Sequence, residues 1–102
     1  MPRRRTVPRL SAKEALVLEL LIEKRGMYGL ELVAASRRRL KRGTVYVTLG
    51  RMEDKRYVAS RLEDAPPSAG GLPRRVYEAT ALGRRLVEAR AHLARLLPEF
   101  AR

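Results

Sequence analysis

The sequence predicts a mainly α-helical fold with one small β-hairpin, arranged as a winged helix-turn-helix domain followed by a C-terminal dimerisation helix. Three observations indicate this class. Three short helical segments come first, and the third has one apolar and one basic face. Two alternating segments, 57–63 and 74–79, then flank a loop rich in proline and glycine. The last segment carries apolar residues in a heptad pattern.

Length and charge limit the alternatives. The chain has 102 residues, which is enough for one domain with a modest core. It has 23 Lys and Arg against 11 Asp and Glu, so its formal net charge is +12. A charge of this size favours a polyanionic partner, with nucleic acid first and an anionic membrane surface second.

The residue inventory argues against an enzyme, a cofactor and a metal site. The absence of cysteine removes disulfides, thiol nucleophiles and zinc fingers. The single histidine, His92, has no cluster of further ligands around it. No apolar run approaches the length of about 18 residues that a membrane span needs. Because Met1–Arg5 is not followed by the apolar segment of a signal peptide, we expect a cytoplasmic protein.

The N-terminal part of the chain is predicted as an arm and a capped helix. Residues 1–10 carry four arginines and two prolines and are expected to form a flexible basic arm. The predicted DNA-binding domain spans residues 11–80. Ser11 is expected to cap its first helix, because Glu14 completes a capping-box pattern before an apolar run. Gly26 is placed to end this helix.

The next two helices form the predicted helix-turn-helix. The second opens over Tyr28–Leu32, and its expected apolar face consists of Leu30, Val33 and Ala34. The third starts within residues 41–44. Steps of four and three residues mark its core face as Val45, Leu49 and Met52. The same spacing gives a polar and basic line of Thr44, Thr48, Arg51 and Lys55.

The wing and the last helix complete the predicted fold. Residues 57–63 and 74–79 are expected to be antiparallel strands. Thr80 is expected to cap the last helix, which Pro98 ends or kinks. This helix and its tail occupy residues 81–102. Its heptad seam, predicted to form a homodimer interface, consists of Leu82, Leu86, Ala89, Leu93, Leu96 and Phe100.

Three groups of residues are predicted to bind DNA. Five cations in six positions precede the third helix and suit phosphate contacts. The polar line of that helix suits base contacts, because arginine binds guanine and threonine can touch the thymine methyl group. Two arginines follow the wing loop, and strand alternation lets at most one of them enter a groove. The predicted residues are Arg37, Arg38, Arg39, Lys41, Arg42, Thr44, Tyr46, Thr48, Arg51, Lys55, Arg74 and Arg75. For Tyr46, a phosphate contact and packing into the core stay open as equal alternatives.

Three motifs carry a resemblance to a known family. They are Tyr28-Gly29-Leu30-Glu31-Leu32, then Gly43-Thr44-Val45-Tyr46 with Leu49, Arg51, Met52 and Glu53, and finally the segment 71–83. In this order and spacing, the chain resembles the PadR family of bacterial transcriptional regulators over about residues 11–97. The resemblance implies a repressor, similar to the compact members of the family that have one helix after the wing.

Two positions depart from the family pattern. Arg56 stands where the family usually has a glycine at the end of the third helix. If that position requires a left-handed backbone, an arginine there carries a strain of about 1 kcal/mol. Val47 replaces a proline that is common after the tyrosine of the second motif.

The resulting hypothesis is a sequence-specific regulator that binds double-stranded DNA as a homodimer on a pseudo-palindromic operator. The main alternative is a basic RNA-binding or ribosome-associated protein, although five aromatic residues offer few platforms for base stacking. Another alternative is a winged helix that only recruits proteins. A small hydrophobic or planar effector ligand at the dimer interface also stays open.

Overall fold

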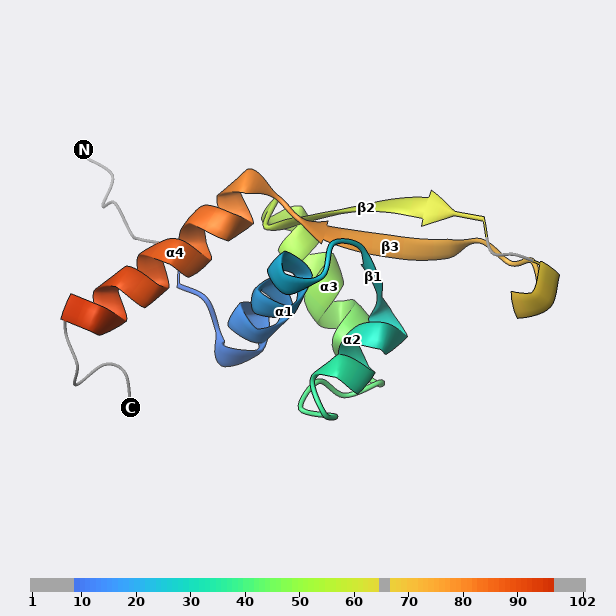
Figure 1. Cartoon of the computed structure of the whole chain (residues 1–102), viewed down its shortest axis with the longest axis horizontal. Helices are drawn as coiled ribbons and strands as arrows, with labels where there is room; N and C mark the ends of the chain where they lie inside the picture. The colour runs from blue at the N-terminus through green and yellow to red at the C-terminus, as the bar shows by residue number, and fades with distance from the viewer. Residues whose placement is uncertain (1–8, 65–66, 97–102) are drawn as a thin grey trace, which may run out of the picture.

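The computed structural model describes residues 9–64 and 67–96, and the predictions for residues 1–8, Pro98 and Phe100 lie outside these ranges. Three helices lie under a small sheet, a β-hairpin extends to one side as a wing, and the last helix extends to the other (Figure 1). The elements in chain order are α1 (Ala12–Glu23), β1 (Met27–Tyr28), α2 (Gly29–Ala35), α3 (Val45–Asp54), β2 (Val58–Glu63), a 3-10 turn (Pro67–Ala69), β3 (Arg74–Ala79) and α4 (Ala81–Leu96). The predicted winged helix-turn-helix with a C-terminal helix is therefore confirmed.

Helix α1 begins at the predicted capping box. Glu14 N–H donates to Ser11 Oγ at 3.1 Å, and Ser11 N–H donates to Glu14 Oε1 at 2.9 Å, so two otherwise unpaired amides are satisfied. The helix ends at Glu23, and Gly26 with φ 72° then turns the chain into β1. Before the helix, Leu10 packs against the core.

The sheet has a third strand that the sequence pattern did not predict. Its order is β1-β3-β2, with both pairs antiparallel. Strand β1 is only two residues long, and Met27 and Tyr28 pair with Tyr77 and Val76. Such a short strand leaves no alternation to detect. The wing hairpin itself lies where it was predicted, with Val58 opposite Ala79 and Glu63 opposite Arg74.

The predicted apolar face of α2 is wrong. Leu32 is fully buried, whereas Leu30 and Ala34 are exposed and Val33 is only partly buried. Helix α2 has seven residues and follows β1 directly, so strand pairing sets its orientation. Two turns are too few for periodicity to identify the buried face. On α3 the predicted core face is confirmed, since its three members are all buried.

Helix α4 is held by its first turn. Gly83 N–H donates to Thr80 Oγ1 at 3.0 Å, which confirms the predicted cap. Gly83 is buried, and Leu86 packs against the core. The remaining described members of the predicted seam are exposed within one chain: Leu82, Ala89, Leu93 and Leu96.

The carboxylate of Glu14 links α1 to the end of α3. Lys55 Nζ lies 2.8 Å from Glu14 Oε2. Partial burial raises the pKa of Glu14, but the hydrogen bonds from Lys55 and Ser11 together outweigh it, so this pKa lies below its usual value. A carboxyl group with a lowered folded-state pKa stabilises the fold above its unfolded pKa. That stability is lost as pH falls through the folded pKa.

Replacing Glu14 is therefore expected to have a pH-dependent effect. Glu14→Gln should lower the free energy of unfolding at pH 7 by about 1 kcal/mol, because it removes the charge that pairs with Lys55, while the amide oxygen can still accept from Ser11 N–H. The difference in the free energy of unfolding between the variant and the wild type should shrink below about pH 4. Urea unfolding between pH 3 and 7 measures it, with the exposed Glu23→Gln as control. A gap that is constant with pH would contradict the assigned role.

Candidate nucleic-acid interface

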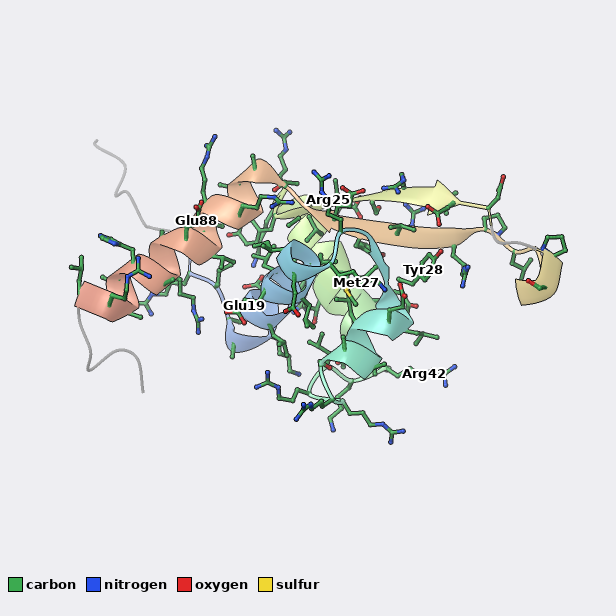
Figure 2. The ribbon with its side chains drawn as sticks, in the orientation of Figure 1. Glu19, Arg25, Met27, Tyr28, Arg42 and Glu88 are labelled. Atoms are coloured by element: carbon green, nitrogen blue, oxygen red, sulfur yellow. The ribbon has the colours of Figure 1, made fainter. Side chains whose placement is uncertain are left out.

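The turn between α2 and α3 presents its cations from a rigid backbone. Ser36 is buried, and its Oγ donates to the Val33 carbonyl at 2.8 Å and accepts the Leu40 N–H at 3.0 Å. Leu40 is buried in the core. These anchors leave the five predicted phosphate-binding cations exposed, and none forms an ion pair within the described residues: Arg37, Arg38, Arg39, Lys41 and Arg42. Arg42 points outward from the body of the domain (Figure 2).

Three arginines adopt a left-handed backbone. Arg56 has φ 66°, so the condition under which it carries backbone strain is met. Arg37 and Arg38 have φ 55° and 66°, and sequence reasoning did not predict them. This region favours glycine, so each arginine costs roughly 1 kcal/mol there.

Helix α3 presents two different surfaces to the solvent. Its outermost line holds Val47, whose side chain is 54% exposed, and Gly50, at which a Cβ would meet nothing within 4 Å. The predicted polar line lies on one flank instead. Thr44, Thr48, Arg51 and Lys55 border a groove of about 530 Å³ whose other side is the start of α1, and Val47 lines the same groove. Sequence reasoning missed Val47 and Gly50, since neither is polar.

Tyr46 lies on the opposite flank of α3, against the start of α2. A Cβ built on Gly29 would lie 2.5 Å from Tyr46 Cε1 and 2.8 Å from its hydroxyl oxygen. Tyr46 is still 50% exposed, so it packs on Gly29 and also presents part of its side chain to the solvent. The contact gives Gly29 a reason to be glycine.

A methyl group at Gly29 is expected to displace the Tyr46 ring. Gly29→Ala should leave the core folded, because the ring is exposed enough to move, but it should weaken duplex DNA binding about as much as Tyr46→Ala does. Affinity for one duplex, measured for both variants and for Gly29→Ala/Tyr46→Ala, tests the coupling. Additive losses in the double variant would argue against it.

The two wing arginines lie on opposite faces of the sheet. The Arg74 guanidinium carbon lies 4.1 Å from the Tyr28 ring centroid, and Tyr28 Oη donates to Glu63 Oε1 at 2.9 Å. The hydrogen bond to Glu63 raises the pKa of Tyr28 above its usual value. Tyr28 lies alongside the wing hairpin (Figure 2). The sequence pattern did not predict that Tyr28 holds Arg74.

Arg75 lies on the face of the wing that is turned towards α3. Its Nη1 donates to Ser60 Oγ at 3.0 Å, and Ser60 Oγ donates to Glu53 Oε2 on α3 at 2.7 Å. This chain of bonds places Arg75, and not Arg74, on the same side of the hairpin as α3.

Other kinds of site find little support in the described parts of the chain. No three His, Asp or Glu side chains of residues 9–64 and 67–96 come together as a metal site. No helix among these residues is both long enough and apolar enough to cross a membrane. A hollow of about 270 Å³ beside α1 is lined by Ala12, Ala15 and Leu16 together with four charged residues, Lys13, Glu19, Arg39 and Arg90. The effector ligand stays a prediction.

Comparisons with known proteins identify the family. The sequence model of the transcriptional regulator PadR-like family matches residues 17–89. A search of curated proteins found no match. Solved structures do match. A PadR family transcription regulator from Clostridium difficile R20291 is 32% identical with a TM-score of 0.70, covering 85% of this chain and 91% of that one.

Two further structures are similar over nearly the same length. A PadR family transcriptional regulator from Eggerthella lenta DSM 2243 is 25% identical with a TM-score of 0.70, covering 87% of this chain and 77% of that one. A PadR-like transcription factor from Bacteroides fragilis is 21% identical with a TM-score of 0.71, covering 87% and 85%, and supports the fold alone. With the family match and the Clostridium similarity, the chain belongs to the PadR-like family of transcriptional regulators, which bind DNA and are not enzymes.

Proposed function

We propose that the chain is a sequence-specific repressor that binds double-stranded DNA as a homodimer in the cytoplasm. The observation that carries the proposal is the position of the basic turn immediately before α3. The cations of that turn form no ion pair within the described ranges and suit the phosphates of a duplex, while the exposed face of α3 suits its major groove. Arg75 on the inner face of the wing suits the neighbouring minor groove or its phosphates.

The exposed leucines of α4 support the homodimer. Leu93 and Leu96 are 49% and 62% exposed in one chain. Apolar side chains that repeat along one helix face bury their surface when a second copy packs on them. A two-fold dimer presents two α3 helices to half-sites about one helical turn apart, which gives a pseudo-palindromic operator. Occupation of such a site would repress transcription by blocking the promoter.

A charged side chain on the face of α4 that carries Leu93 and Leu96 is expected to break the dimer. Leu93→Asp should give a folded monomer at micromolar concentration, because the side chain is already half exposed in one chain and its loss leaves no cavity in the core. Sedimentation velocity measures the oligomeric state of the variant. The matched control is Ala91→Asp, which adds the same charge on the opposite face of the helix and should stay dimeric. A dimeric Leu93→Asp variant would place the interface elsewhere.

Selection of bound duplexes from a random pool tests the proposed function. The expected result is a recovered pseudo-palindrome with two half-sites about one turn apart. Recovery of no consensus would contradict sequence-specific recognition. Stronger binding to single-stranded RNA than to any duplex would instead favour the RNA-binding alternative.

A further inference from the structure

The groove between α1 and α3 combines several groups that can bind an anion. Lys13 enters it from the first turn of α1, and Thr44, Thr48 and Arg51 enter it from α3. Its volume is about 530 Å³, which exceeds that of one phosphate group. The two sides of the groove come from segments about 30 residues apart, so the sequence alone did not bring Lys13 to the recognition helix.

The charge of the groove is positive despite an acidic residue in its wall. The two oxygens of Glu14 are already used: Oε1 accepts from Ser11 N–H, and Oε2 pairs with Lys55. Lys13 and Arg51 form no ion pair within residues 9–64 and 67–96. The groove therefore keeps two unneutralised cations beside two hydroxyl groups.

We propose that this groove binds the phosphodiester backbone of one DNA strand, with Lys13 as a phosphate ligand, an assignment that rests on the proposed function. The line of α3 that projects furthest, with Val47 and Gly50, would face the base edges. A helix in the major groove lies between two phosphate backbones, because the groove is only about 12 Å wide. Side chains on its flanks therefore meet phosphates. Lysine and threonine donate to phosphate oxygens in such positions, whereas the longer Arg51, one helical turn from Val47, is assigned to a base edge.

Lys55 has a different role in this arrangement. Its ammonium group is 2.8 Å from Glu14 and also lies over the Tyr57 ring, 5.5 Å from the centroid. The ion pair holds the start of α1 against the end of α3 and so keeps the two sides of the groove together. Lys55 is thus a positioning residue, whereas Lys13 forms no ion pair within residues 9–64 and 67–96 and is available to a DNA phosphate.

A pair of lysine variants tests the groove. The probe is a duplex recovered by selection, with a scrambled duplex beside it. Lys13→Ala should weaken binding to both duplexes several-fold and flatten the log–log salt slope by about 1 to 2 units, counting both subunits. The matched control is Lys24→Ala, which removes the same charge from an exposed lysine paired with Glu31. Its slope should stay within about half a unit of wild type, because a distant surface charge is screened.

Two further readouts keep the result interpretable. Lys13→Ala should unfold at the wild-type temperature, because Lys13 is exposed and unpaired in the described chain. Thr48→Val, which removes one hydroxyl group at nearly constant volume, should also weaken binding to both duplexes. If Lys13→Ala and Lys24→Ala give the same affinities and salt slopes while the wild type binds, the assignment of this groove to a phosphate backbone is wrong. The proposed function is then unaffected. If wild type binds no duplex at low salt, the proposed function fails and this inference fails with it.

Discussion

Gly83→Ala is expected to lower the free energy of unfolding by about 1–3 kcal/mol or more, because the site has no room for a methyl group. A Cβ at this position would overlap the carbonyl oxygen of Tyr57 and lie 2.8 Å from Leu18 Cδ2. Tyr57 O also accepts the Thr80 N–H at 3.0 Å, so the backbone that would have to move supports the start of α4. Urea unfolding measures the loss.

Gly50→Ala is the matched control, since it is the same substitution inside another helix. No atom lies within 4 Å of the added methyl group, so the variant should gain up to about 1 kcal/mol from helix propensity. Opposite signs at the two glycines would support the packing of α4 on α1 and on the start of β2. A Gly83→Ala variant as stable as wild type would show that α4 does not dock there as described.

Arg51→Ala is expected to have the largest effect on sequence preference. Arg51 lines the groove one helical turn from the exposed Val47, where a guanidinium group can reach a base edge. Its loss should cost about 1–3 kcal/mol per base contact and relax the preference at one position of each half-site. Affinity for the selected duplex and for a set of single-base variants of it measures both effects.

Arg38→Gly separates a phosphate contact from this base contact. Glycine removes the charge and also the left-handed strain, so the fold should become more stable by up to about 1 kcal/mol. Binding should nevertheless weaken on all duplexes alike, with a salt slope flatter by about 1 to 2 units. If Arg51→Ala loses affinity equally on the selected and scrambled duplexes, Arg51 is a phosphate contact and the predicted orientation of α3 is wrong.

The sequence predicted the parts of the fold that depend on local patterns. The Ser11 capping box, the core face of α3, the wing strands and the Thr80 cap all follow from residues close together in the chain, and all were confirmed. Strand β1 and the buried face of α2 were not predictable in this way. Both depend on pairing with β3, about 50 residues later in the chain.

The candidate site was predictable as a set of cations but not as a surface. Charge density identified the turn before α3, whereas the roles of other residues depend on distant neighbours. Tyr46 is placed by Gly29, Arg74 is held by Tyr28, and Lys55 is paired with Glu14. None of these partners is within ten residues, so helix or strand periodicity carries no signal for them.

Affinity as a function of salt, for the selected duplex and for a scrambled one, tests the central claim most directly. If each subunit neutralises about 3 to 5 phosphates, a dimer should give a log–log slope of about −5 to −9. The selected duplex should bind at least about 1000-fold more tightly than the scrambled duplex at the same salt concentration. Equal affinities for the two duplexes, or a slope near zero, would contradict a homodimer that reads DNA sequence through α3 and holds the backbone through its cations.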